Sequence, residues 1–189
     1  MRRGAQALRL TESCDPRVMR VRGDFFRYDR GFPATVTQVF HAMSDSAHFD
    51  DFDRVWSQRD LSRAIGWKRL KSWDSSARTL RAIFEARPEF CHSGGTIAQG
   101  GFITAWLDAS MAQATMRDTQ FQNNIATLEL KVSFLKAVPP GEVLAEGRVL
   151  RRGKRVVFLE ASLFNLDGTE LLATATSTGL IVPLVLEKE

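Results

Sequence analysis

The longest apolar segment lies near the middle of the chain and is typical of a buried helix. Between Gly100 and about Met116, hydrophobic residues fall on nearly every face of a 3.6-residue period. A surface helix would instead show a single apolar stripe. We therefore expect this segment to form a long helix that is covered on all sides.

Strand-like segments precede and follow this helix. Before it, Trp67–Trp73 and Leu80–Phe84 are joined by a turn at Asp74. After it come four longer segments, 125–137, 142–151, 154–165 and 170–182. Short turns at Gly153 and Gly168 indicate that the last three segments are antiparallel neighbours. The pattern predicts an α+β fold in which an antiparallel sheet of about five strands wraps around one long buried helix.

A single sheet of this size leaves part of the helix uncovered. Nearly the whole helix surface is apolar, whereas one sheet covers one side of it. We therefore expect a second copy of the chain to cover the rest, in a homodimer or a dimer of dimers.

The first 42 residues differ from the rest of the chain. The net charge of +4 arises there, because eight arginines outnumber four acidic residues, while the remainder carries equal numbers of acidic and basic side chains. Glycine and proline are scattered through this segment, and no apolar period is sustained. We expect residues 1–42 to be a weakly ordered, dispensable extension of a folded domain at 43–189. The first helix of that domain should start at Ser44 or Asp45 and run to about Gln58.

The remaining composition is that of an ordinary globular protein, with 44% hydrophobic and 25% charged residues. No apolar run approaches the length of about 18 residues that a membrane-spanning helix needs, and the N-terminal residues lack the hydrophobic core of a secretion signal. Cys14 and Cys91 are the only cysteines, and they lie too far apart to form a metal-binding motif. We expect a cytoplasmic protein with neither a membrane nor a nucleic-acid partner.

Asp108 stands out within the apolar helix. It is the only residue between Glu89 and Arg117 that is certain to be charged. Because burying an unpaired carboxylate is costly, a sequence that keeps one in such a place usually uses it. A catalytic role and a structural role at a sheet edge or capping donor both fit this pattern.

Gly100 and Gly101 open the same helix. Without Cβ atoms they let a substrate carbonyl approach the backbone, and free N–H groups at a helix start stabilise a developing oxyanion. Gln99, immediately before them, could direct its side-chain amide to the same oxygen. The two glycines equally permit close packing of the helix on the sheet, so this motif alone does not decide between the two roles.

The segment Gly95–Asp108, Gly-Thr-Ile-Ala-Gln-Gly-Gly-Phe-Ile-Thr-Ala-Trp-Leu-Asp, resembles the signature of hotdog-fold acyl-CoA thioesterases, in particular the phenylacetate-degradation type. That signature is a Gly-Thr turn, a His- or Gln-Gly-Gly helix start and an Asp nine residues beyond the His or Gln, as from Gln99 to Asp108. Later segments, 127–136, 141–147 and 167–175, resemble the other strands of the family in the same order. The resemblance extends from about Trp67 to Pro183.

The resemblance implies a hotdog fold and hydrolysis of an acyl- or aryl-CoA thioester to the free acid and CoA, without a metal or an organic cofactor. It assigns the general base or nucleophile to Asp108 and the oxyanion-binding N–H to Gly100. Gln99 stands where many relatives have His, Thr127 matches a hydroxyl that positions the attacking water, and Gly101 is expected beside the substrate.

The loop before the helix departs from the family pattern. Relatives usually have Asn six residues before the His or Gln, whereas this chain has Ser93 there, with His92 beside it. Ala98 looks like an inserted residue, so the register of this loop is open. We expect Ser93 to contact the substrate, and the water-positioning part of the site to differ from that of the family.

A basic hairpin surrounds Gly153. Arg151, Arg152, Lys154 and Arg155 resemble the family's cationic clusters that meet the phosphates of CoA, and cations suit phosphate chemically. A solvated charged hairpin that protects a sheet edge is an equally good interpretation. On the first interpretation, Arg151, Arg152 and Lys154 bind the substrate.

Two other functions are compatible with parts of the sequence. A non-catalytic acyl-CoA-binding sensor, with an N-terminal interaction segment, would explain the arginine-rich extension. Residues 1–42 lack the two patterned helices of a DNA-binding domain, however, and a sensor does not need Asp108. A dehydratase-type hotdog enzyme would need a catalytic histidine near the helix, for which His92 is the only candidate. The acyl group itself cannot be read from the sequence.

Overall fold

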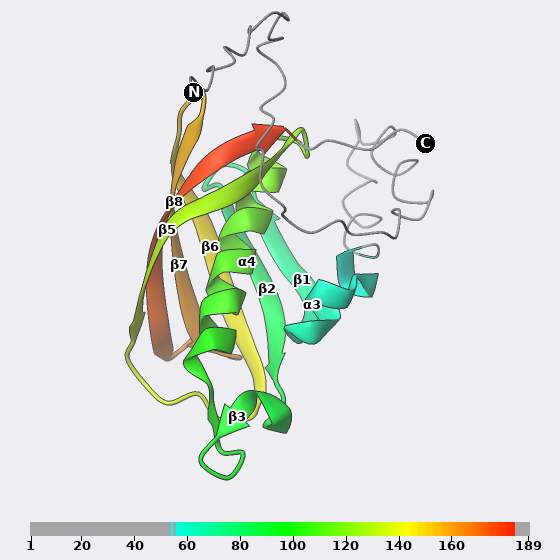
Figure 1. Ribbon diagram of the computed structural model, residues 1–189, viewed down its shortest axis with the longest axis vertical. Helices are drawn as coiled ribbons and strands as arrows, with labels where there is room; N and C mark the ends of the chain where they lie inside the picture. The colour runs from blue at the N-terminus through cyan, green and yellow to red at the C-terminus, as the bar shows by residue number, and fades with distance from the viewer. Residues whose placement is uncertain (1–53, 55, 184–189) are drawn as a thin grey trace, which may run out of the picture. The chain divides into compact units, whose positions relative to one another are not determined.

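The computed structural model describes residue 54 and residues 56–183 (Figure 1). Residues 54 and 56–58 are helical, in agreement with the end of the helix expected to run to about Gln58. The expected extension at 1–42 and the start of that helix lie outside the described residues.

Six strands form one antiparallel sheet with the order β1-β2-β6-β7-β8-β5. Their bounds are β1 Trp67–Asp74, β2 Thr79–Ala86, β5 Asn123–Phe134, β6 Gly141–Arg152, β7 Val156–Asn165 and β8 Leu171–Pro183. These six strands correspond to the six strand-like segments expected from the sequence, and the hairpins β6–β7 and β7–β8 are confirmed. The first strand after the helix, β5, lies at the sheet edge and pairs with β8. It does not pair with β6, the next strand in the chain, which pairs with β2.

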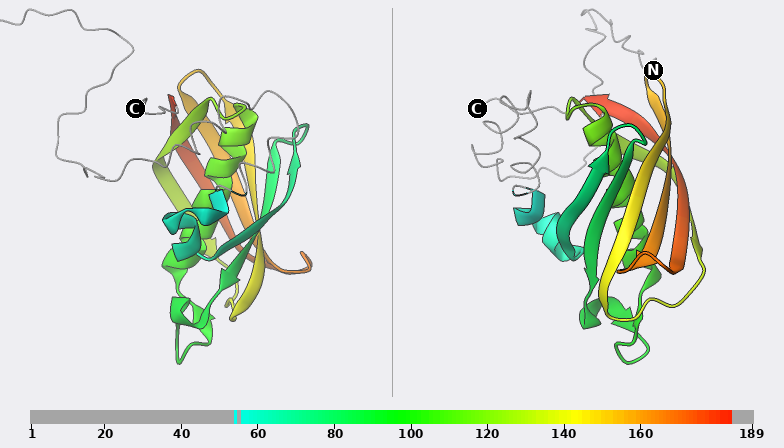
Figure 2. Two further views of the ribbon diagram at one scale, coloured as in Figure 1. Left: turned by 90° about the vertical axis from the view of Figure 1, so that its right-hand side faces the viewer. Right: turned by 180° about the vertical axis from the view of Figure 1, so that it is seen from behind.

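The long helix α4, Gly100–Asp118, packs across one face of the sheet (Figure 1). The side chains of Trp106, Leu107 and Met111 are completely buried between the helix and the strands. Viewed from behind, the sheet lies in front of α4, and no described helix covers this opposite face of the sheet (Figure 2, right). The prediction of an α+β domain with one buried helix is therefore confirmed.

Gly147 sets how closely α4 approaches the sheet. A Cβ atom at this position of β6 would lie 2.4 Å from both the carbonyl carbon and the carbonyl oxygen of Ser110. Real structures do not allow such a contact between a side chain and helix backbone, so only glycine fits here. The centre of the helix is therefore seated directly on the strand backbone.

Short elements precede β1 and α4. The helix α3, Asp60–Ala64, leads into β1, and the indole Nε1 of Trp106 donates to the carbonyl of Ile65 at 2.7 Å. The 3₁₀ helix η1, Pro88–Phe90, is followed by the hairpin β3–β4, Cys91–His92 and Ile97–Ala98.

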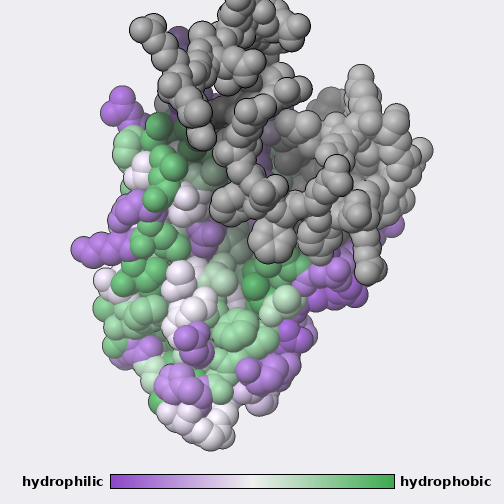
Figure 3. Space-filling view, in the orientation of Figure 1, coloured by the Kyte–Doolittle hydropathy of each residue, from purple (hydrophilic) through white to green (hydrophobic). Residues whose placement is uncertain are grey.

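One face of α4 is incompletely covered within the chain. Thr104, Ala105, Asp108 and Ala112, at helical spacing, are only half-buried. Beside them lies β5, which has no neighbouring strand on its outer edge among the described residues. Its Leu128 and Phe134 side chains are 61% and 53% exposed. Figure 3 shows hydrophobic surface along the side of the domain on which β5 lies. This agrees with the expectation that one sheet leaves part of the helix uncovered, because within the described residues of one copy α4 is not buried on every side.

No helix in the part of the chain that the structure describes is both long and apolar enough to cross a bilayer.

Candidate functional site

The start of α4 presents one free backbone donor. The side chain of Gln99 folds back so that its Oε1 accepts a hydrogen bond from the N–H of Gly101 at 2.5 Å. The N–H of Gly100 donates to no described residue. A helix start concentrates partial positive charge on such groups, so this N–H can bind an anionic or strongly polarised oxygen.

The absence of a side chain at Gly100 shapes this donor's surroundings. A Cβ atom here would lie 3.1 Å from Cζ of Phe134, whose ring packs against the start of the helix. Glycine therefore lets the phenyl ring come close while leaving the N–H uncovered.

Asp108 lies two turns further along α4, on its half-buried face. Its Oδ1 accepts a hydrogen bond from the hydroxyl of Thr127 on β5 at 2.9 Å. The structure therefore brings these two predicted site residues together. The carboxylate is accessible, because nothing in the described chain covers this face of the helix completely.

Asp108 and Gly100 cannot act on one small group within the same copy of the chain. Eight residues of α-helix separate them, which corresponds to about 12 Å at 1.5 Å per residue. A reacting carbonyl needs its donor and its base within about 3 Å of the atoms that they contact. The structure thus divides the predicted catalytic residues into two groups.

A pocket of about 410 Å³ opens at the start of α4. It is lined by His92, Ile97, Ala98, Gly100, Ile103 and the segment 134–138. Backbone hydrogen bonds fix its walls, because the N–H groups of Leu135 and Lys136 both donate to the carbonyl of Leu172, at 2.9 and 3.0 Å. Its size is typical of a small-molecule site, for which about 300–1,000 Å³ is usual.

The hairpin before α4 places its two polar side chains differently. His92 lines the pocket, whereas Ser93 is not among the lining residues. The Ser93 hydroxyl lies 2.8 Å from Nδ1 of His92. Ser93 was predicted to contact the substrate, and in this structure it contacts the neighbouring imidazole.

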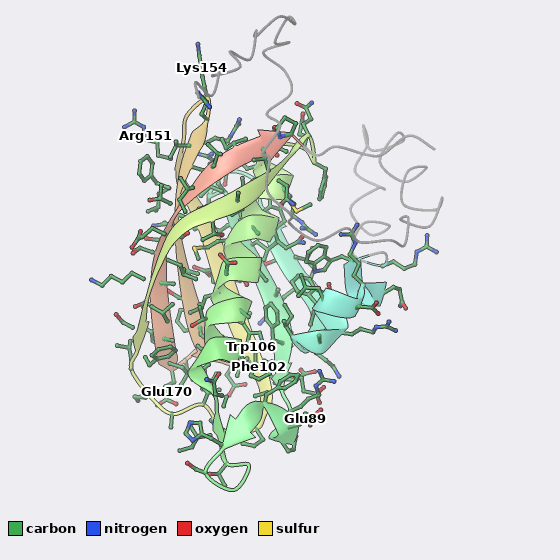
Figure 4. All side chains as sticks on the ribbon, in the orientation of Figure 1. Glu89, Phe102, Trp106, Arg151, Lys154 and Glu170 are labelled. Carbon is green, nitrogen blue, oxygen red and sulfur yellow. The ribbon has the colours of Figure 1, made fainter. Side chains whose placement is uncertain are left out.

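The predicted phosphate-binding cluster lies at the other end of α4. Figure 4 shows Arg151 and Lys154 at the tip of the β6–β7 hairpin, away from Phe102 and Glu170 near the helix start. Arg152 is already engaged, since its Nε donates to Asp118 at 2.5 Å. Within one copy, therefore, the structure does not bring this cluster to the pocket.

Asp118 joins three parts of the fold. Besides Arg152 it accepts two hydrogen bonds from Arg78, in the turn between β1 and β2, at 2.6 and 2.7 Å. Burial disfavours the charged form of this carboxylate, but the two arginines together outweigh burial and hold the pKa of Asp118 below its ordinary value. This network is structural, and it explains why one of the predicted cations is not free.

Sequence reasoning missed most of the pocket wall. The segment 134–138 begins at the end of the edge strand β5 and reaches the helix start through long-range contacts that no local pattern indicates, such as the hydrogen bond from the N–H of Ala98 to the carbonyl of Val138 at 2.8 Å. Among the described residues, no group of three or more His, Cys, Asp or Glu side chains could hold a metal ion.

Comparison with known proteins agrees with this architecture. The sequence pattern of the thioesterase superfamily matches residues 95–172. A protein of Saccharolobus solfataricus, provisionally named an esterase, is 35% identical over 92 residues, which cover 47% of this chain and 63% of that protein. The chain thus spans less than two thirds of the length of this curated relative.

Solved structures show the same fold. A protein of Ralstonia eutropha, described as a provisional thioesterase related to phenylacetic acid degradation, superposes with a TM-score of 0.61 and 26% identity, over 70% of this chain and 98% of that one. A Streptococcus mutans protein solved with bound acetyl-CoA superposes with a TM-score of 0.54 and 18% identity, over 62% of this chain and 90% of that one. The described part of the chain therefore has the hotdog fold, and its residues 95–172 match the thioesterase superfamily.

Proposed function

We propose that this protein hydrolyses an acyl- or aryl-CoA thioester to the free acid and CoA. The superfamily match and the thioesterase-like neighbours support hydrolysis. The neighbour that binds acetyl-CoA and the relative connected with phenylacetic acid support a CoA thioester as the substrate class. We do not assign a metal or an organic cofactor to the reaction, and coenzyme A enters only as part of the substrate.

The observation that carries this proposal is the pairing of Asp108 with Thr127 on an uncovered helix face, combined with the free N–H of Gly100. These groups are the base and the oxyanion donor that thioester hydrolysis needs. Because about 12 Å of helix separates them, a complete site requires Asp108 of one copy and Gly100 of another. We therefore propose a homodimer, or a dimer of dimers, in which each active site is shared.

The surface of β5 favours the same assembly. In the described part of the chain, no strand pairs with the outer edge of β5. The strand exposes Leu128 and Phe134 next to the half-buried face of α4. An exposed strand edge with apolar side chains is a natural site for pairing between chains. A second copy placed there would cover Asp108 and exclude bulk water from the reaction.

The chemistry follows from these positions. In the general-base form, Asp108 takes a proton from a water molecule held by the Thr127 hydroxyl, and the water oxygen attacks the thioester carbon. The carbonyl π electrons move to oxygen, which the Gly100 N–H stabilises, and the tetrahedral intermediate collapses by breaking the carbon–sulfur bond. The CoA thiolate leaves and recovers the proton from Asp108. In the nucleophile form, the Asp108 carboxylate attacks the thioester carbon and expels the CoA thiolate. Water then hydrolyses the resulting mixed anhydride to the free acid and the Asp108 carboxylate, and the proton released protonates the thiolate.

The pocket at the helix start would receive the acyl or aryl group, because its walls are mostly apolar. Arg151 and Lys154 remain candidates for the CoA phosphates, now on another part of the assembly, whereas Arg152 is held by Asp118. In this proposal Gln99 caps α4, and Gly101 gives it the space to do so, since a Cβ there would meet the Gln99 side chain.

Hydrolysis of a panel of CoA thioesters tests this function. We expect the wild-type chain to release CoA from at least one short-, medium- or long-chain acyl-CoA or aryl-CoA, measured with a thiol reagent. Asp108→Asn, which keeps the size and the hydrogen bond to Thr127, should lower kcat by about 10²–10⁴-fold. Unchanged thermal unfolding would show that the variant is folded. Tight CoA-thioester binding without hydrolysis by the wild type would instead favour a sensor.

A further inference from the structure

The pocket at the start of α4 contains one polar side-chain atom that has no role in the mechanism above. Of its ten lining residues, only His92 and Lys136 have polar side chains. Lys136 is ion-paired with Glu170. Nδ1 of His92 is occupied by the Ser93 hydroxyl, so Nε2 is the ring nitrogen left without a partner among the described residues.

The hairpin that carries His92 has a tightly turned, hydrogen-bonded backbone, and the His92 side chain on it is exposed. Ser93, Gly94 and Gly95 are consecutive left-handed residues, with φ of 54°, 71° and 84°. The N–H groups of Gly95 and Thr96 both donate to the carbonyl of His92, each at 3.1 Å. A left-handed conformation is unfavourable for a non-glycine residue, and at Ser93 it accompanies a hydroxyl 2.8 Å from Nδ1 of the imidazole.

The position of Gln99 in the sequence indicates that its side-chain amide is directed to the substrate oxygen, but the structure places this amide elsewhere. Its Oε1 is committed to the N–H of Gly101, and its side chain is absent from the pocket lining. Gln99 therefore does not supply a side-chain donor beside the Gly100 N–H, and such a donor to the substrate oxygen would come from another element. Because His92 and Gly100 line the same pocket, the β3–β4 hairpin is the element that can supply it.

We propose that His92 is a further catalytic residue of the thioester hydrolysis proposed above, on which this inference rests. Its Nε2–H donates to the thioester carbonyl oxygen that also accepts from the Gly100 N–H. In the neutral tautomer with the proton on Nε2, Nδ1 accepts a hydrogen bond from the Ser93 hydroxyl, which lies 2.8 Å away. Ser93 is a positioning residue in this arrangement, and the oxyanion has one backbone donor and one side-chain donor.

Two substitutions of different chemistry test this role. His92→Phe fills a similar space but cannot donate, whereas His92→Gln keeps an N–H near the position of Nε2. We expect His92→Phe to lower kcat for phenylacetyl-CoA, or for the best substrate of the panel, by about 10–10³-fold, the range for a lost oxyanion donor. KM should change much less, and His92→Gln should recover most of the rate. A packing role would not separate the two variants in this way.

A spectroscopic measurement reports on the hydrogen bond itself. With a CoA thioester bound to Asp108→Asn protein, whose turnover is slow, the carbonyl stretching frequency should rise when His92→Phe is added and should return toward its original value with His92→Gln. If the wild-type chain is active and His92→Phe keeps its kcat, or if both His92 variants are equally poor, the role of His92 is refuted while the proposed function stands. If the wild-type chain hydrolyses no thioester, the proposed function is refuted and this assignment with it.

Discussion

A shared active site predicts that two inactive variants will restore each other. The first variant, Asp108→Asn, loses the base and keeps Gly100. The second, Gly100→Pro, loses the backbone N–H and keeps Asp108. Proline suits the first position of a helix, and Gln99, with φ of −69° and ψ of 136°, has the extended conformation that a residue before proline needs.

The expected recovery can be worked out from the geometry. In a hybrid dimer, one site combines Asp108 of the proline variant with Gly100 of the asparagine variant and is intact, while the other site carries both defects. Random pairing makes half of the dimers hybrid, so the co-expressed mixture should recover about a quarter of the wild-type activity, and purified hybrids should recover about half. Each parent alone should retain on the order of one per cent or less.

Gly100→Ala is the matched control for the proline variant. It adds the same Cβ atom, 3.1 Å from the ring of Phe134, but keeps the N–H. The half-exposed ring can move by a few tenths of an ångström, so we expect a clearly smaller loss with alanine than the 10²–10³-fold loss for a missing oxyanion donor. The assay is CoA release by hybrids purified through two different tags. A hybrid that is no more active than its parents would refute the shared site.

Three further predictions concern the residues around this site. Thr127→Val should lower kcat about fivefold to tenfold, because Asp108 loses a hydrogen bond worth about 1 kcal/mol, whereas Thr127→Ser should stay near the wild type. Gly147→Ala should lower the free energy of unfolding by about 3 kcal/mol in urea denaturation, since its Cβ meets helix backbone; Gly179→Ala, whose Cβ would lie 3.3 Å or more from side-chain atoms, should cost less than half as much. Asp118→Asn should destabilise the protein by about 1–3 kcal/mol at pH 7. Because the folded-state pKa of Asp118 is below its ordinary value, this difference should shrink as the pH falls below about 4, and a difference that is constant down to pH 2 would contradict the arginine pairing.

Local patterns in the sequence were sufficient to predict the elements and the helix start. The Gly100-Gly101 pair marks the beginning of α4, and the turn at Gly168, with φ of 76°, joins two strands as expected. Thr127 was expected near Asp108 only from the family resemblance, and the structure brings the two side chains into hydrogen-bond contact.

Other features depend on contacts that local patterns do not contain. Alternation shows which face of β5 is apolar, but it does not identify β8 as its neighbour. Charge composition shows a basic hairpin, but not that Asp118 holds Arg152. The motif at Gln99 indicates a polar group near the helix start, but only the folded hairpin shows that His92 faces the pocket instead.

The position of β5 at the sheet edge also determines the order in which the domain can assemble. The strands β6, β7 and β8 are joined by short hairpins and can pair as soon as they leave the ribosome. β5 is made earlier but pairs from Asn123 with Pro183, so it must wait for the last strand before its backbone is satisfied. During this interval β5 and the inner side of α4 are both uncovered, and neighbouring nascent chains can pair through them. Folding yield should therefore fall with chain concentration more steeply than the stability of the finished domain alone would indicate.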